Sequence, residues 1–384
     1  MVRPGRKGFG HYLALAAIAI AVLIYLTPIY WIVVTSLKSA GDILTLVPKF
    51  VFQVTLENYQ KLMPPQIPQT TYVFIAEALI GIFAFFLPLR NTTVTRLFGL
   101  LWGGVLISTC LCTFAMTTNY NFLMLAIYST VAYLLTSPWK AADVKRLRLS
   151  FVSAGVLAII AVCTSLADGG SRYFSQLLNS IIIGFGSTIL AVGLGTLSAY
   201  AFSRFKVARK EDLLFFILST RMLPPVVVVI PIYLMYSVLG LRDTHLGLIL
   251  LYTTFNVSFA VWLMKGFIDE IPKEYEDAAL VDGYTRFQTF IKVVLPQSVT
   301  GIAATAVFCL ITAWNEFAFA LVLTEVGGKA VTAPPSITSA VGSGGVDWGR
   351  IAAATFVFLL PVAIFTFLMR RHLLRGVTFG AVKK

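Results

Sequence analysis

The sequence predicts an all-α polytopic membrane protein, and its composition and hydropathy pattern carry this prediction. The chain has 384 residues, of which 58% are hydrophobic and only 12% are charged. Soluble domains contain about 25% charged residues, so the composition argues against an ordinary water-soluble globule. Several segments contain about 20 mostly apolar residues, the length that spans a bilayer as a helix. Because these runs are continuous rather than alternating, they do not fit the strands of a membrane barrel.

The apolar runs predict about ten transmembrane helices. They are expected near residues 12–34, 71–89, 97–115, 121–136, 149–166, 179–202, 212–236, 246–264, 298–323 and 351–369. The first run follows three basic residues, as a signal peptide does. It is longer than a typical signal sequence and lacks a clear small-residue cleavage site, so we expect an uncleaved span.

The distribution of positive charge predicts how these spans are oriented. The formal net charge is +13, and most Lys and Arg residues lie in the two termini and in the even-numbered connections. Cytoplasmic loops carry this excess, so we expect both termini in the cytoplasm. A nucleic-acid partner is not expected, because it would require a basic face on a soluble domain.

The cysteines indicate neither a metal site nor a redox site. Cys110, Cys112, Cys163 and Cys309 all lie inside apolar runs, where free cysteine packs as a small hydrophobic residue. The first two form a C-x-C pair, but no His or further Cys lies nearby. We therefore predict that the chain binds no metal.

The loop after the eighth span is too elaborate for a simple connection. Residues 274–296 read EYEDAALVDGYTRFQTFIKVVLP. Pro272 predicts a helix start, because proline at the first helical position costs no hydrogen bond, and the acids that follow meet the positive end of the helix dipole. Gly283 is expected to end this helix.

A second helix is predicted directly after that glycine. Thr285, followed three residues later by Gln288, forms a capping box. The apolar residues that follow recur at helical spacing and give one apolar face, until Leu295-Pro296 breaks the helix. We therefore expect two short helices on the cytoplasmic face.

Two interpretations of this loop remain open. In the first, an interfacial helix rests on lipid headgroups, although an anionic inner leaflet repels acidic side chains. In the second, the small side chains of Ala278 and Ala279 let the helix dock into a groove on a cytoplasmic protein. We favour docking, with the acids and alanines together on the docking part.

The same stretch resembles the EAA loop of ATP-binding-cassette importer permeases, whose pattern is E-A-A-x3-G-x9-I-x-L-P. Asp277-Ala278-Ala279, Gly283, Val293 and Leu295-Pro296 fall at those spacings, with Asp and Val in place of the usual Glu and Ile. Further stretches resemble the carbohydrate-importer branch, in particular the maltose-permease type of subunit that ends in G-A-V-K. They are residues 179–207, 221–235, 312–324 and 375–384.

The resemblance implies a permease subunit of an ATP-driven importer for a sugar or sugar-like solute, in the prokaryotic cytoplasmic (inner) membrane. It implies a six-span permease core, with four inserted spans in residues 66–170. Residues 1–65 would hold the first span and an external loop, and 171–384 the core domain with its coupling loop at 265–297. The insertion is either a stabilising bundle or a docking site for an accessory membrane protein or lipid.

The resemblance also implies partners and cofactors. The chain would be no enzyme and would bind no cofactor itself, because a partner ATPase uses the ATP and Mg. Expected partners are a second permease subunit, an ATPase dimer, an extracytoplasmic solute-binding protein and membrane lipids. By position alone, external loop 324–349 is expected to reach the binding protein, and a disordered loop is the alternative.

Two sets of site residues follow from the resemblance. The first set is expected to transmit motion from the ATPase: Glu276, Asp277, Ala278, Ala279, Asp282, Gly283, Leu295 and Pro296. The second set is a tail expected to reach between the two ATPases: Gly380, Ala381, Val382 and Lys383. A basic tail resting on acidic headgroups is the alternative for the second set.

Polar residues inside the predicted spans are candidates for the solute pathway, because polar groups are costly in lipid. They are Asn256, Trp314, Asn315 and Glu316. Asn315 and Glu316 either face the solute or hold neighbouring helices together, and Arg221 is a potential partner of Glu316. In the insertion, Glu77 needs a partner.

An ion-coupled secondary solute transporter is the competing function. Such a carrier places its site at the interface of internal repeats and typically uses intramembrane charges there. Intramembrane charges are few in this sequence, and a carrier of that kind needs no elaborate docking loop. The importer permease is therefore the favoured function.

Overall fold

The computed structural model describes most of the chain outside residues 65–169. The described residues are 9–64 except 46 and 48, 170–338, 341–342 and 345–378, with isolated positions at 67, 71, 75, 162, 165 and 166. The predicted insertion, with Glu77 and the first three cysteines, and the tail from Gly380 to Lys383 lie outside them. The expected domain boundaries and the roles of the insertion and tail stay predictions.

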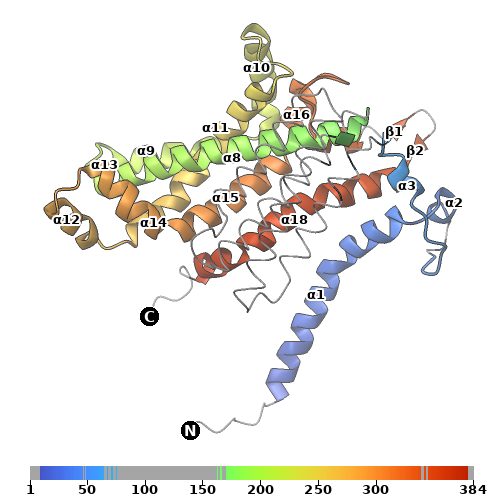
Figure 1. Ribbon diagram of the computed structural model, residues 1–384, viewed down its shortest axis with the longest axis horizontal. Helices are drawn as coiled ribbons and strands as arrows, with labels where there is room; N and C mark the ends of the chain where they lie inside the picture. The colour runs from blue at the N-terminus through green and yellow to red at the C-terminus, as the bar shows by residue number, and fades with distance from the viewer. Residues whose placement is uncertain are drawn as a thin grey trace, which may run out of the picture. The chain divides into compact units, whose positions relative to one another are not determined.

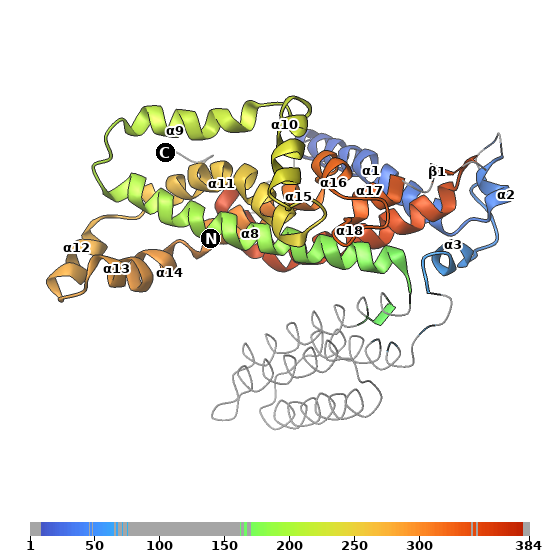
Figure 2. The same ribbon diagram turned by 90° about the horizontal axis from the view of Figure 1, so that it is seen from above.

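The chain forms two compact units (Figures 1 and 2). The first contains residues 1–62 and 336–368, and the second contains residues 63–335 and 369–384. Four described helices are long and apolar enough to cross a membrane, and two bent helix pairs raise the number to as many as six. These correspond to the six spans of the predicted core, whereas the total of about ten is not tested by the described residues.

Three helices form the centre of the second unit: α8 (Arg172–Arg204), α11 (His245–Asp269) and α15 (Val299–Trp314). Small residues let α8 and α11 approach closely, as is common between membrane helices. A Cβ atom added at Gly195 would lie 2.5 Å from the Cβ of Ala260. Ala191, Val192 and Cys309 complete this buried cluster.

The predicted span 212–236 is not a single straight helix. α9 (Lys210–Ser219) and the short 3-10 helix η1 (Thr220–Met222) are followed, after a bend of 92°, by α10 (Pro225–Val238). The cause is the Pro224-Pro225 pair: proline forces the residue before it out of the helical region, and Leu223 is extended with ψ 122°.

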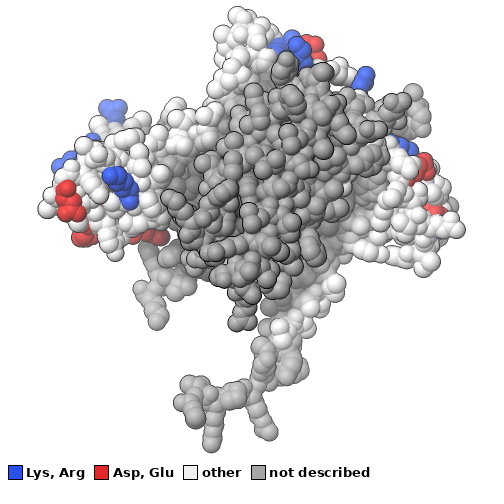
Figure 3. All heavy atoms as spheres, in the orientation of Figure 1, with Lys and Arg blue, Asp and Glu red and all other residues white. Residues whose placement is uncertain are grey.

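The predicted span 298–323 also divides, because α15 ends at Trp314 and α16 (Ala318–Leu323) begins after a break. Before α15 lie α12 (Glu274–Val281), α13 (Arg286–Thr289), the π-helical turn η2 (Phe290–Val294) and α14 (Leu295–Gln297). Figure 3 shows acidic and basic side chains gathered at the end of the unit that carries α12. The α13–α14 segment is bent by 75° relative to α15.

The described part of the predicted external loop is ordered by hydrogen bonds. The Asp243 carboxylate accepts from the backbone N–H groups of Lys329 and Ala330 at 2.8 and 3.1 Å. Asn179 Nδ2 donates to the carbonyls of Lys329 and Val331 at 2.8 and 2.9 Å. Residues 329–331 therefore do not fit the disordered alternative.

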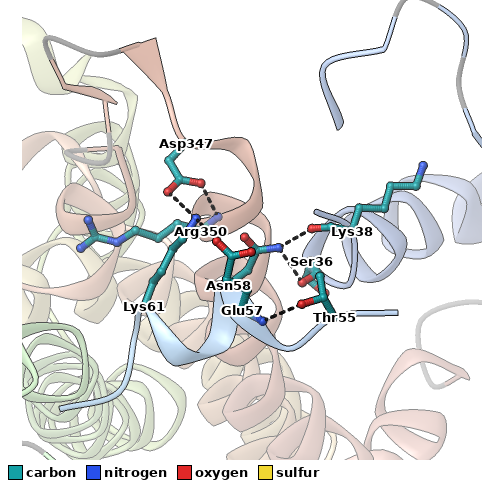
Figure 4. Close-up of polar contacts among 8 residues, drawn as sticks. All are labelled: Ser36, Lys38, Thr55, Glu57, Asn58, Lys61, Asp347 and Arg350. Carbon is teal, nitrogen blue, oxygen red and sulfur yellow. Dashed lines mark hydrogen bonds and ion pairs between the residues drawn. The ribbon is translucent and has the colours of Figure 1, made fainter. Parts of the chain in front are cut away.

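The first unit contains α1 (Phe9–Ser36), α2 (Ala40–Ile43), α3 (Glu57–Gln60) and, up to residue 368, α18 (Trp348–Thr378). A short hairpin, β1 (Val341–Gly342) paired antiparallel with β2 (Gly345–Val346), precedes α18, and α17 (Ala333–Thr338) precedes the hairpin. Buried Asn58 donates to the carbonyls of Ser36 and Lys38 at 3.0 and 2.8 Å, so it satisfies the end of α1 (Figure 4).

Asp347 connects α3 to the start of α18 (Figure 4). Its carboxylate accepts from the Arg350 N–H at 3.1 Å and pairs with Lys61 Nζ at 3.2 Å. Burial raises the pKa of Asp347, but the Arg350 N–H and the Lys61 ammonium together hold it below its usual value. These contacts of the Asp347 carboxylate therefore stabilise the folded chain fully when the pH is above the ordinary pKa of Asp. The stabilisation is lost as the pH falls through the lowered pKa of Asp347.

The close contact of α8 with α11 makes a testable prediction. Gly195→Val is expected to lower the free energy of unfolding by about 1–3 kcal/mol, because the added side chain overlaps α11. Gly193→Val is the matched control, since no heavy atom lies within 4 Å of its Cβ position. Thermal unfolding of the purified protein measures both, and equal stability of the two variants would contradict the packing described.

Candidate functional site

The acidic loop forms the two short helices that its sequence predicts. α12 spans Glu274–Val281 with Lys273 as its N-cap, so Pro272 precedes the helix and, contrary to the prediction, is not its first residue. Gly283 follows with φ +86°. The capping box is confirmed: the Gln288 N–H donates to Thr285 Oγ1 at 3.2 Å, and the Thr285 N–H donates to Gln288 Oε1 at 2.9 Å. The left-handed conformation at position 283 favours glycine and sets the turn between the helices.

The second half of the loop differs from its prediction. Phe290 and Val294 are buried, but Phe287 and Ile291 are exposed, so the predicted apolar face is only partly used for packing. Leu295-Pro296 does not end the helix at once, because α14 continues to Gln297 before the bend. Pro296 has no N–H to donate to a helical hydrogen bond. The turn before α14 is η2, which is π-helical.

The two faces of α12 have different surroundings. Glu276 is 2% exposed and Ala279 is 6% exposed, whereas Asp277, Ala278 and Asp282 are exposed. Ala278 and Ala279, predicted to offer one face to another backbone, therefore lie on different sides of α12, the first exposed and the second buried. Successive helical residues lie about 100° apart, so neighbouring positions point in different directions.

Glu276 reaches across to α8. Its Oε1 forms a buried ion pair with Nε of Arg204, the last residue of α8, and its Oε2 accepts from the Tyr200 hydroxyl at 3.0 Å. The side chains of Arg204 and Glu276 are 6% and 3% exposed. Both carboxylate oxygens are thus satisfied, as a buried charge requires.

Arg204 also binds the end of α11. Its Nη2 donates to the carbonyls of Ile268 and Ile271 at 3.0 and 2.8 Å. Ile268 lies in the last turn of α11 and Ile271 lies two residues past its end, so the guanidinium holds both the end of the helix and the connection that follows it. Apolar side chains, including Met264 and Phe290, pack around the polar cluster.

The sequence prediction missed Arg204 and Tyr200. Arg204 contributed to the prediction only as one of the positive charges of a cytoplasmic connection. A usable signal existed: a single Arg at the very end of a long apolar helix, in a chain whose acidic loop follows a neighbouring span. Sequence alone does not indicate which of the acids in that loop is its partner.

The candidate pathway residues lie in two different environments. Asn256 and Trp314 are 1% and 3% exposed, and Asn256 Nδ2 donates to the Cys309 carbonyl at 3.2 Å, which joins α11 to α15. Asn315 is exposed and donates to the Ile311 carbonyl at 2.9 Å. Their assignment to the solute pathway stays a prediction.

Glu316 lies at the break between α15 and α16. Its carboxylate accepts from the Phe319 and Ala320 N–H groups at 2.9 and 3.1 Å and from the Tyr252 hydroxyl at 2.7 Å. It therefore caps α16 and connects it to α11, as in the interpretation that it holds helices together. Arg221 instead lies over the Phe259 ring, 4.9 Å from its centroid.

Among the residues that the structure describes, no group of three or more His, Cys, Asp or Glu side chains lies close enough to hold a metal ion. The contacts of this site are instead ion pairs, hydrogen bonds and apolar packing.

Comparison with known proteins identifies the family. The model of the family described as "binding-protein-dependent transport system inner membrane component" matches residues 191–378. The trehalose transport system permease protein SugB of Mycobacterium tuberculosis is 38% identical over 216 residues, which are 56% of this chain and 78% of that protein. A probable ABC transporter permease protein, y4oR, of Sinorhizobium fredii is 36% identical over 207 residues, 54% and 74% of the two chains.

A solved structure supports the fold. A bacterial ABC transporter involved in import of the polysaccharide alginate matches with a TM-score of 0.51 and 15% identity, over 97% of this chain and 98% of that one. The resemblance first seen in the acidic loop is confirmed by the relatives. This chain belongs to the family of inner-membrane permease components of binding-protein-dependent ABC transporters.

Proposed function

We propose that this chain is a permease subunit of an ATP-driven importer for a sugar or sugar-like solute, and that α12 docks on the partner ATPase. The observation that carries the proposal is the two-sided environment of α12. One face presents Asp277, Ala278 and Val281 to solvent, while Glu276 holds the other face to α8. A helix exposed on one side and fixed on the other suits the transfer of force between subunits.

The transport functions for which several relatives are named support a carbohydrate as the solute. Relatives from Mycobacterium tuberculosis, Thermococcus litoralis and Streptomyces coelicolor are named for transport of trehalose, of trehalose and maltose, and for uptake of diacetylchitobiose. All these compounds are small sugars rich in hydroxyl groups. For this chain the proposed solute is therefore a di- or oligosaccharide or a similar polyol.

The proposed assembly contains a second permease subunit, an ATPase dimer that uses ATP and Mg, and an extracytoplasmic binding protein. The family description, which names a binding protein and the inner membrane, supports this assembly. We propose that both termini are cytoplasmic, that the 380–383 tail approaches the ATPases, and that loop 324–349 faces the binding protein. The ordered residues 329–331 suit such a contact.

Transport driven by ATP is the first expected outcome. In liposomes that contain the assembled transporter and its binding protein, we expect a labelled sugar to accumulate only when ATP is supplied. Sugar uptake is measured with ATP alone and with a proton or sodium gradient alone. Uptake driven by an ion gradient without ATP would support the competing secondary carrier and overturn the proposal.

Charge reversal on the exposed face of α12 tests docking. Asp277→Lys is expected to leave the chain inserted but to lower the amount of copurified ATPase about tenfold, a loss of about 1.4 kcal/mol of binding free energy. Glu211→Lys, an exposed acid on α9, is the matched control. Equal ATPase recovery from both variants would contradict docking through α12.

Substitution of Gly283, between the two loop helices, tests whether the loop needs a fixed backbone conformation. Gly283→Ala is expected to cost about 1–2 kcal/mol, because an L-residue with a side chain resists positive φ. Amide hydrogen exchange in residues 274–289 should therefore accelerate about tenfold. Gly266→Ala, in the interior of α11 with open space around it, is the control and should exchange as the unaltered chain does.

A further inference from the structure

We propose that Arg204 is the joint through which α8 and α11 follow the movements of α12, with Glu276 as its partner. The inference rests on the proposed function and extends it, because it assigns a part in the transmission of motion to Arg204, which lies outside the acidic loop. Arg204 and Glu276 are positioning residues here. Their side chains are buried and face the interior of the second unit rather than the exposed face of α12.

Three elements meet at the Arg204 guanidinium. Arg204 itself is the last residue of α8, and Glu276 lies in the first turn of α12. Ile268 lies in the last turn of α11, and Ile271 lies two residues past the end of that helix. Different donor nitrogens of the one planar group bind different elements: Nε binds the carboxylate, and Nη2 binds the two carbonyls. The group thereby fixes the direction, as well as the distance, of α12 relative to both helices.

Burial makes this joint stiff. The pair is almost closed to solvent, so salt and water screen it far less than they screen a surface pair. The Tyr200 hydroxyl binds the second carboxylate oxygen, and the Tyr200 ring lies 4.8 Å from the ring of Phe290 on η2. Any rotation of α12 away from α8 would leave a buried charge without its partner, which strongly disfavours independent motion.

The joint lies at one end of a long rigid element. α8 has 33 residues and is therefore about 50 Å long. Near its other end, Asn179 binds the backbone of residues 329 and 331. Arg204 and Asn179 are 25 positions apart on the helix, or about 38 Å. A displacement of α12 is thus carried along α8 to the segment at residues 329–331 by contacts that are all formed in this structure.

Coupling efficiency of the assembled transporter tests the proposal. The measurement is the amount of sugar imported per ATP hydrolysed in liposomes. For Arg204→Met we expect the ATPase to copurify as before, but the ratio to fall at least about tenfold, because a buried charge-assisted connection is lost. Arg204→Lys, which keeps the charge but not the fork of donors, should fall in between.

The matched control is Lys206→Met, which removes an exposed base from the same connection. Its ratio should equal that of the unaltered transporter. An Arg204→Met ratio equal to the control would overturn the proposal. If Arg204→Met fails to insert, Glu276→Gln carries the test, because it removes the charge and keeps the size of the side chain. An unchanged ratio of sugar imported to ATP hydrolysed for Glu276→Gln would also overturn the proposal.

A distance measurement separates failure of the joint from failure of the proposed function. Spin labels at positions 197 on α8 and 281 on α12, both exposed, should give one narrow distance distribution in the full chain. Arg204→Met should broaden it, and Lys206→Met should not. A narrow distribution in Arg204→Met would refute the joint even where the ATPase copurifies. Absence of any ATPase partner would instead refute the proposed function.

Discussion

The buried ion pair between Arg204 and Glu276 determines the arrangement of the loop end of the second unit. Removing two charges from water costs several kcal/mol each, and the cost is offset only when geometry is good and the remaining polar atoms are satisfied. Here the guanidinium and the carboxylate bind each other, the guanidinium also binds two backbone carbonyls at and just past the end of α11, and the carboxylate also binds a tyrosine hydroxyl. Removing one partner from such a cluster costs about 3–5 kcal/mol, so the orientation of α12 is strongly preferred over alternatives.

The same physical solution recurs at the second break in the unit. Broken helices expose backbone groups that lipid does not satisfy, so side chains of neighbouring elements must bind them. Glu316 does this for the start of α16 and takes a further bond from Tyr252 of α11. Each carboxylate is paired with a tyrosine of a long helix. The long helices α8 and α11 therefore hold the short elements in place.

Local features of this fold could be predicted from sequence because they depend on neighbouring residues. Gly283, the Thr285–Gln288 capping box and the helix of acids before them were all predicted correctly. The break at Pro224 was missed, although a proline pair signals it, because hydropathy measures only whether a segment is apolar. A straight span and a bent one have the same composition.

Long-range features could not be predicted in the same way. Glu276 is separated from Arg204 by 72 positions, and its acidic neighbours in the loop offered equally suitable partners. The choice among them depends on which face of α12 meets α8, which is set by packing around Phe290 and Val294. Glu316 illustrates the same limit: sequence left its role open, and its position at a helix start decides its contacts.

Site-directed cross-linking tests whether α12 docks on the ATPase through its exposed face. In a chain whose four native cysteines are replaced, a single cysteine is placed at position 278 or at position 279 of the assembled transporter. The first position is exposed and the second is 6% exposed. If α12 docks through its exposed face, we expect an ATPase cross-link from position 278 and none from position 279. No cross-link from position 278, or equal cross-linking from both, would contradict this docking.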